Sequence, residues 1–145
     1  MELPAFTPSD GYLPPGEHPL TWTQVRHLLC WNDHRLELIN RLEVHLVALR
    51  QAGCRTVWLN GSLVSTKDFP RDFDVLFEIR GVRPADLPDQ LRHPIDSQAV
   101  GGDLLPIDEQ SFGGRMMIES TFGTDHEGNP KGVLRVELSS ITIEA

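Results

Sequence analysis

The segment NGSLVSTKDFPRDFDVLFEI (residues 60–79) decides the fold of this chain. It follows TVWL (56–59), whose β-branched and aromatic residues predict a strand, and it ends in DFDVLFEI (72–79), which predicts a second strand. Alternate side chains of a strand point to the same face, so Asp72 and Asp74 should share one face while the apolar residues pack on helices. The segment therefore predicts two strands, joined by a small-residue turn, with two carboxylates where the second strand begins.

Two carboxylates this close repel, and each raises the pKa of the other unless a cation lies between Asp72 and Asp74. Mg²⁺ suits such a position, because it is held by one or two carboxylates together with substrate phosphates, and Mn²⁺ takes similar ligands. Gly61 lets the backbone approach a phosphate, which the hydroxyl of Ser62 and successive N–H groups can hold. Lys67 is placed to contact a phosphate or to be a solvated loop residue. Each half alone is typical of an ordinary turn or strand start; together they indicate a site for a metal and a nucleoside triphosphate.

The pattern apolar-G-S-x9-D-x-D-apolar, seen in VWLNGSLVSTKDFPRDFDVLF, resembles the signature of the nucleotidyltransferase superfamily with the DNA polymerase beta-like fold. It is most similar to the minimal bacterial members of that superfamily, and the surrounding helix, strands and turn extend the likeness over about residues 32–105. The resemblance implies that Gly61 and Ser62 bind the triphosphate and that Asp72 and Asp74 bind the metal ions.

Members of that superfamily usually have a third carboxylate on a neighbouring strand, which binds one metal and helps to activate the attacking hydroxyl. Two residues compete for this role. Asp103, in AVGGDLLP, has a strand-like tail and lies where similar minimal transferases place a V-D-L-V segment; it also fits a polar loop after two glycines. Glu137, in VLRVEL, fits an exposed strand face. We favour Asp103 as the third metal ligand and keep Glu137 as the alternative.

Two helices are predicted before the first strand. Thr21 and Gln24 form a capping box that begins a short helix ending near Leu29. A longer amphipathic helix should run from Asn32 or Asp33 to Ala52. Its charged residues lie mostly off the apolar stripe: Arg35, Glu37, Arg41, Glu43 and Arg50.

The remaining segments complete an α+β fold with a short mixed β-sheet and helices packed mainly on one face. Residues 1–19 are rich in proline and glycine and predict an extended N-terminal arm. A third strand is expected around residues 101–106. The last third predicts a C-terminal β-hairpin in which residues 115–122 pair with residues 132–143. The whole chain, 1–145, should form a single nucleotidyltransferase-like domain.

Composition narrows the class of protein. A formal net charge of −8 argues against an extensive nucleic-acid-binding surface, which needs clustered Lys and Arg. The cysteines Cys30 and Cys54 suit a reducing compartment better than a disulfide scaffold. No apolar run approaches the roughly 18 residues of a membrane span, and the N-terminus has no signal-peptide pattern. We therefore expect a cytoplasmic protein without a membrane partner.

These features favour a Mg²⁺- or Mn²⁺-dependent nucleotidyltransferase that moves NMP from an NTP, with ATP favoured, to a hydroxyl acceptor. The acceptor could be a protein side chain, an RNA 3′ end or a small molecule. A partner protein could supply the surface that recognises it, as in toxin–antitoxin pairs built on minimal transferases. The alternative is a non-catalytic domain that binds a nucleotide or a partner protein through the same fold. A third and weaker hypothesis is a metal-dependent phosphohydrolase.

Overall fold

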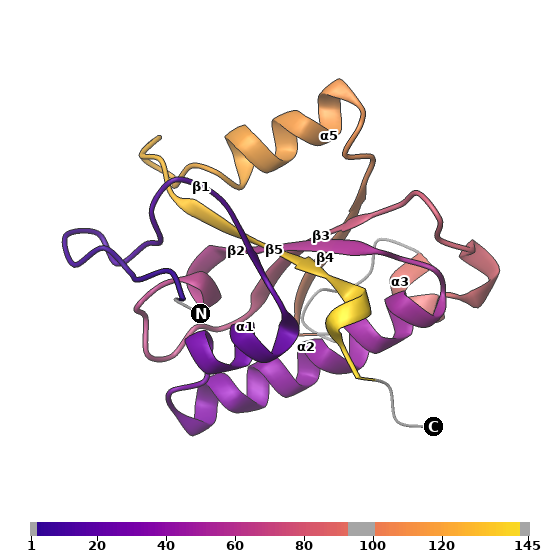
Figure 1. Ribbon diagram of the computed structural model, residues 1–145, viewed down its shortest axis with the longest axis horizontal. Coiled ribbons are helices and arrows are strands. Elements are labelled where there is room, and N and C mark those ends of the chain that lie inside the picture. Colours follow the sequence, from indigo (N-terminus) through magenta and orange to yellow (C-terminus); the bar gives the residue numbers. More distant parts are fainter. Residues whose placement is uncertain (1–2, 93–100, 143–145) are drawn as a thin grey trace.

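A computed structural model describes residues 3–92 and 101–142 as a five-stranded mixed sheet with helices (Figure 1). The strand order is β1-β5-β2-β3-β4. The central strand β2 is antiparallel to both of its neighbours, whereas the outer pairs β1–β5 and β3–β4 are parallel. The principal elements, in chain order, are β1 (Gly16–Leu20), α1 (Trp22–Leu29), α2 (Asp33–Gln51), β2 (Thr56–Asn60), β3 (Phe73–Glu78), α3 (Asp89–Arg92), β4 (Gly102–Ile107), α5 (Phe112–Met116) and β5 (Gly132–Glu137). The expected α+β class with a mixed sheet is confirmed.

Helices α1 and α2 begin where the sequence predicts. The side chain of Thr21 accepts a hydrogen bond from the Gln24 amide, and the Gln24 side chain accepts one from the Thr21 amide at 2.9 Å, so the capping box is complete. Asn32 caps α2 with its side chain, which accepts a hydrogen bond from the Arg35 amide at 2.8 Å. The apolar faces of both helices pack on one side of the sheet. Arg35 differs from the prediction, because its side chain is completely buried although it was expected to lie mostly off the apolar stripe.

Strand β3 is buried on both faces, and its alternation sets the direction of the acidic side chains. Phe73, Val75 and Phe77 belong to the core formed with α1 and α2. Leu76 instead packs with Trp58 on the opposite face, which the segment directly after α5 covers with Ile118 and Phe122. Asp74, two residues before Leu76, therefore faces the α5 side, as the alternation of the strand predicts.

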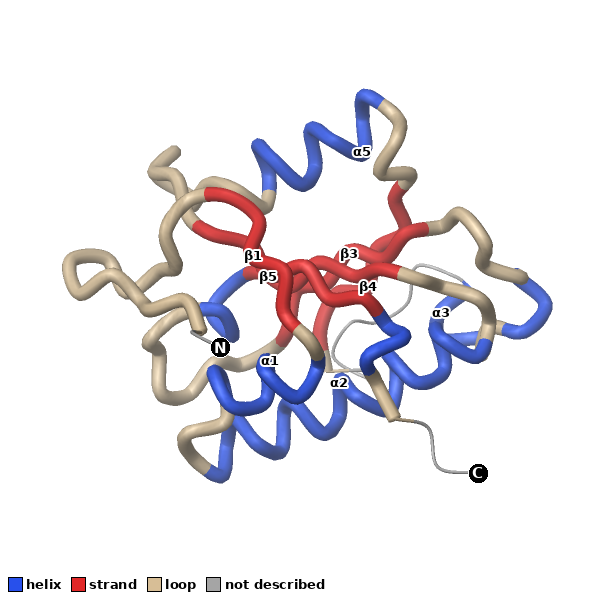
Figure 2. Tube along the Cα trace, viewed as in Figure 1, coloured by secondary structure: helices blue, strands red, loops and turns tan. Residues whose placement is uncertain are grey.

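The predicted C-terminal hairpin is wrong. Residues 115–122, expected to form its first strand, lie largely in α5 and in a π-helical segment, Met117–Thr121, which cover the second face of the sheet (Figure 2). Ile118 and Phe122 are four positions apart, as the buried face of a helix requires, and both pack against the sheet. Strand β5 is present, but it pairs with β1 and β2 in place of a hairpin partner.

The N-terminal segment is more than an extended arm. Residues Gly16–Leu20 form the edge strand β1, which runs parallel to β5. Pro19 is tolerated there because the N–H side of an edge strand needs no partner. Further upstream, Tyr12 forms an isolated bridge with Ser65, so this segment also reaches the turn after β2.

No helix within residues 3–92 and 101–142 combines the length and the apolar composition needed to cross a membrane.

Candidate functional site

The turn after β2 and the carboxylate of Asp74 form one continuous structure. Asn60, the last residue of β2, is the register partner of Asp74 in β3, and Gly61 follows Asn60 directly. Gly61 has a φ of +78°, and a Cβ atom at this position would collide with Oδ2 of Asp74. The backbone conformation favours glycine here, and any larger residue would have to displace the Asp74 carboxylate. The two halves of the sequence motif are therefore in direct contact.

A cavity of about 1010 Å³ opens beside this contact. Five of the residues singled out in the sequence line it together: Gly61, Ser62, Lys67, Asp72 and Asp74. The opposite wall comes from residues 120–126 and Lys131, and the N-terminal segment contributes Asp10 and Tyr12. The volume is sufficient for a nucleotide-sized ligand.

The electrostatics of the cavity are dominated by acidic groups. Burial raises the pKa of Asp74, and the neighbouring charges of Asp72 and Asp103 raise it further. Lys131 acts in the opposite direction on the pKa of Asp74, while burial lowers the pKa of Lys131 itself. Among the described residues, no ion pair includes any of the three aspartates.

The structure separates the two candidates for the third carboxylate. Asp103 on β4 is the direct register partner of Asp74 on the parallel strand β3, so their side chains leave the sheet on the same face. Glu137 is the register partner of Thr56, at the opposite end of β2 from the Gly61 turn. Asp103 thus lies beside Asp74, close enough to raise its pKa, but it does not line the cavity with Asp72 and Asp74. Glu137 lies away from this group. Whether Asp103 binds a metal stays a prediction.

The donor set fits a hard divalent cation that is bound together with phosphate. Within residues 3–92 and 101–142, no three His, Cys, Asp or Glu side chains are arranged as a complete metal site. Mg²⁺ does not need such a cage, because it commonly takes one or two carboxylates and fills its other positions with water and substrate phosphate oxygens. Asp72 and Asp74 are the residues placed to supply the carboxylate oxygens.

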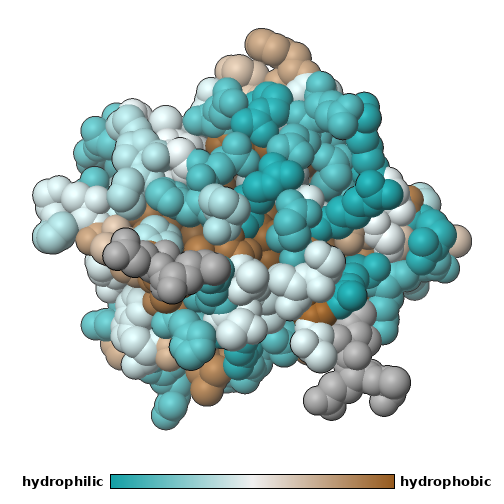
Figure 3. All heavy atoms as spheres, in the orientation of Figure 1, coloured by the Kyte–Doolittle hydropathy of each residue, from teal (hydrophilic) through white to brown (hydrophobic). Residues whose placement is uncertain are grey.

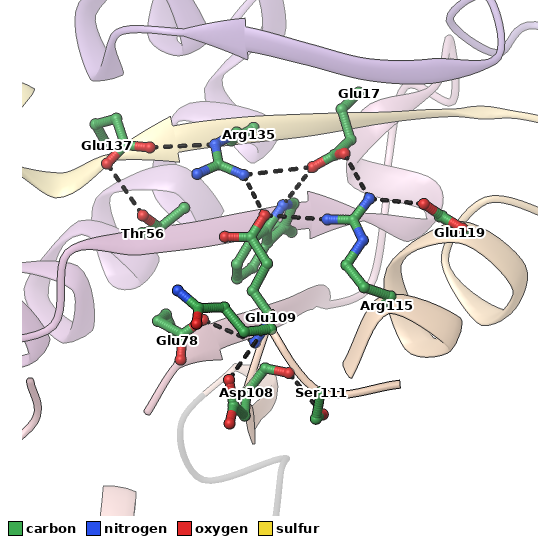
Figure 4. A network of polar contacts seen from close by, with 12 residues as sticks. Glu17, Thr56, Glu78, Asp108, Glu109, Ser111, Arg115, Glu119, Arg135 and Glu137 are labelled. Atoms are coloured by element: carbon green, nitrogen blue, oxygen red, sulfur yellow. Dashed lines mark hydrogen bonds and ion pairs between the residues drawn. The ribbon is translucent and has the colours of Figure 1, made fainter. Parts of the chain in front are cut away.

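Glu137 instead belongs to a second group of polar residues, between β5 and α5 (Figure 4). Its carboxylate accepts hydrogen bonds from Thr56 Oγ1 at 3.0 Å and from Arg135 Nε at 3.2 Å. Arg135 also contacts Glu109 at 2.5 Å, and Arg115 contacts the same Glu109 at 3.0 Å. Both carboxylate oxygens of Glu137 are therefore engaged in contacts within the protein.

Sequence reasoning missed Lys131 and the N-terminal wall of the cavity. Lys131 precedes β5 and reaches the electrostatic environment of Asp74, while burial and then the nearby charge of Asp125 raise the pKa of Tyr12. The position of Tyr12 depends on the parallel pairing of β1 with β5, and that of Lys131 on the pairing of β5 with β2 and of β2 with β3. No local pattern around either residue signals these pairings.

The chain belongs to a protein family of unknown function, DUF6932, whose model matches residues 4–137. The match spans the strand–turn–strand unit, the third strand and β5, and therefore every residue of the candidate site. No curated protein and no solved structure matches the chain.

Proposed function

We propose that this protein is a metal-dependent nucleotidyltransferase that transfers NMP from an NTP to a hydroxyl acceptor. The observation that carries the proposal is the contact between the Asp74 carboxylate and the Gly61 turn within one cavity. A triphosphate needs backbone donors and an adjacent cation, and a cation needs unpaired carboxylates. The turn can supply the backbone donors, and the aspartates beside it can supply the carboxylates. The resemblance of the motif to the nucleotidyltransferase signature supports the same reaction.

In the proposed reaction, an acceptor hydroxyl oxygen attacks the α-phosphorus of the NTP. A new oxygen–phosphorus bond forms, the bond to the bridging oxygen breaks, and pyrophosphate leaves with that electron pair. Divalent ions, when bound, stabilise the charge on the attacking and leaving oxygens. Asp72 and Asp74 would hold the ions, while Gly61 and Ser62 would orient the triphosphate for in-line attack.

The remaining residues have distinct proposed roles. Asp103, beside Asp74 in the parallel strand pair, accepts the proton of the attacking hydroxyl directly or through water. Lys67 and Lys131 lie on the wall of the cavity, where their ammonium groups would meet phosphate oxygens. Lys131 reduces the repulsion among the aspartates before the cation binds.

ATP is the nucleotide we propose, and the acceptor is a protein side chain, an RNA 3′ end or a small molecule. The net charge of −8 disfavours a long nucleic acid as the acceptor. A partner protein, as in toxin–antitoxin pairs, would supply the recognition surface that larger transferases carry in additional domains. We place this activity in the cytoplasm.

A non-catalytic nucleotide-binding domain is the second candidate. The side chain of Asp103 is exposed, and no complete metal cluster exists among the described residues. Both observations are compatible with a cavity that binds Mg²⁺–NTP but does not align an acceptor. Binding without turnover, even with cell extract present, would favour this candidate.

Incubation of the purified protein with α-³²P-labelled NTPs, Mg²⁺ or Mn²⁺ and whole-cell extract tests the transferase proposal. We expect label to enter one macromolecule or small acceptor, with release of unlabelled pyrophosphate. Asp74→Asn is the control, and it should abolish labelling. Release of the γ-phosphate as inorganic phosphate, without labelled acceptor, would indicate a phosphohydrolase instead.

A further inference from the structure

Arg35 is a buried cation that contacts the inner side of the Gly61 turn. Its side chain is 0% exposed, although it starts from the first part of α2. The guanidinium lies over the ring of Trp31, 3.6 Å from its centroid. It donates hydrogen bonds to carbonyl oxygens of Leu29 (3.1 Å), Leu63 (2.8 Å), Ser65 (2.6 Å) and Lys67 (2.6 and 2.9 Å), and more weakly to that of Ser62 (3.4 Å). A single side chain therefore joins α2 to most of the segment between β2 and the aspartates.

The charge of Arg35 is not neutralised by an ion pair within the described residues. Every hydrogen-bond acceptor that contacts it is a neutral backbone carbonyl. Burial lowers the pKa of the guanidinium to about 10, so it remains protonated at neutral pH. The negative charge of Asp68 acts on the guanidinium from nearby, although no ion pair joins the two side chains. Burying a charge without such a pair costs free energy.

The orientation of the carbonyls determines where the amides of the turn point. In a trans peptide the C=O and N–H groups point in opposite directions, and no cis peptide occurs in the described residues. The amides that follow the carbonyls of Ser62 and Leu63 belong to the buried residues Leu63 and Val64 of the 3₁₀-helix Gly61–Val64. The amide of Thr66, which follows the Ser65 carbonyl, donates to the Gly11 carbonyl at 3.0 Å. The cavity lies beside this turn and is lined by Gly61 and Ser62. Arg35 therefore acts on the conformation of the turn that lines the cavity, and not by turning these amides toward it.

We propose that Arg35 is a positioning residue for the triphosphate: it fixes the turn over residues 61–67 from behind and adds an unpaired positive charge next to it. This inference rests on the proposed function, because it requires an NTP in the cavity. The role differs from that of Lys67 or Lys131, which line the cavity and could touch the phosphates themselves. Arg35 acts through the backbone of the turn and through the electrostatic field in a region of low dielectric.

Calorimetric titration of Arg35→Gln with ATP and with AMP, both with Mg²⁺, tests this role. Glutamine removes the charge and most of the donors, so we expect the affinity for ATP to fall about tenfold or more and that for AMP less than about threefold, since the field acts on the ligand charge. A purely structural role would weaken both ligands equally. Arg50→Gln is the matched control: Arg50, at the other end of α2, also donates to a backbone carbonyl, that of Ile141, and its loss should leave both affinities unchanged.

The outcomes separate this inference from the proposed function. If the wild type binds Mg²⁺–ATP tightly, and Asp74→Asn weakens this binding but Arg35→Gln does not, only the role of Arg35 is overturned. Equal losses for ATP and AMP would also overturn it. Absence of any ATP binding by the wild-type protein overturns both proposals. If Arg35→Gln does not fold, Arg35→Lys decides: it keeps the charge but has fewer donors, so ATP affinity should fall about threefold to fivefold. Wild-type affinity in Arg35→Lys would contradict the proposal.

Discussion

Two groups of acidic residues lie on the same face of the sheet, yet their surroundings are opposite in character. In the group over β1 and β5, Arg115 and Arg135 contact the carboxylates of Glu17, Glu109, Glu119 and Glu137 (Figure 4). Hydrophilic residues gather on this side of the molecule, around α5 (Figure 3). In the group at the ends of β3 and β4, no ion pair includes Asp72, Asp74 or Asp103 among the described residues.

The difference separates carboxylates that are paired with arginines of the chain from carboxylates that we propose bind a divalent cation. Where arginines are present, each glutamate is held by a cation of the chain itself, and the network joins β1, β5 and α5. Around Asp74, burial and then the charges of Asp72 and Asp103 raise its pKa, and Lys131 opposes this shift without forming an ion pair. A folded protein tolerates such repulsion most readily where an external cation relieves it.

The largest expected effect is on the group of aspartates that form no ion pair among the described residues; we call it the unbalanced group, and the group paired with Arg115 and Arg135 the balanced group. Asp72→Asn and Asp74→Asn should each lower nucleotidyl transfer by about 100-fold or more, because each removes a ligand for the ions that stabilise the transition state. Initial rates of labelled-NMP transfer, measured on variants whose circular dichroism matches that of the wild type, check this expectation. Transfer at the wild-type rate in either folded variant would refute the metal assignment.

The next effect distinguishes the two groups directly. Asp103→Asn should abolish transfer while NTP binding is partly retained, because Ser62 and the other aspartates still hold the metal and the phosphates. Glu137→Gln should change the rate by less than about twofold, since Glu137 contacts Thr56 and Arg135 far from the cavity. Rates and NTP dissociation constants of both variants are the measurements. A large rate loss in Glu137→Gln with full activity in Asp103→Asn would reverse the assignment.

Substitutions in the balanced group should lower the free energy of unfolding and leave the affinity for the nucleotide unchanged. Arg135→Ala leaves Glu109 and Glu137 without this cation and removes a guanidinium 5.4 Å from the Trp58 ring centroid, so unfolding in urea should show a loss of about 1–2 kcal/mol. Arg80→Ala, which breaks a more exposed pair with Asp108, is the control and should cost less than about 0.5 kcal/mol. A weakened affinity for Mg²⁺–ATP in Arg135→Ala would mean that the two groups are coupled.

The smallest effect is a pH-dependent one. The pKa of Asp74 is raised in the folded state, chiefly by burial and then by Asp72 and Asp103, so its contribution to stability is fully present below the unfolded pKa and is lost as the pH rises through the folded pKa. Asp74→Asn should therefore unfold at a higher temperature than the wild type at neutral pH in EDTA. The difference should shrink when the pH falls below the ordinary Asp value of about 3.9. Thermal unfolding at several pH values checks the sign, and a less stable variant at neutral pH would contradict it.

Much of the fold could be predicted because its signals are local. The capping box at Thr21, the apolar alternation after Asp72 and the turn at Gly61 each act within a few residues, and the structure confirms the helix and strands they predict. The hairpin prediction failed because the mixed apolar and polar sequence of residues 115–122 fits a strand as well as a helix. The spacing of Ile118 and Phe122 decided in favour of the helix.

The parts of the site that were missed depend on contacts between distant segments. Arg35 was expected off the apolar stripe because its charge is apparent in the sequence, whereas its carbonyl acceptors in the Gly61 turn lie about thirty residues away. Lys131 reaches Asp74 only because β5 pairs with β2, which in turn pairs with β3. The choice between Asp103 and Glu137 likewise required the register of neighbouring strands.

Electron paramagnetic resonance of Mn²⁺ with ATP tests whether Asp72, Asp74 and Asp103 hold a divalent cation together with a triphosphate. Mn²⁺ accepts the oxygen ligands that suit Mg²⁺ and provides a spectroscopic signal. We expect wild-type protein to change the spectrum of Mn²⁺–ATP and Asp74→Asn to leave it unchanged, whereas Glu137→Gln should behave as the wild type. The proposed site would be refuted if the Mn²⁺–ATP spectrum is the same with and without the wild-type protein. It would also be refuted if Asp74→Asn changes the spectrum as much as the wild type does.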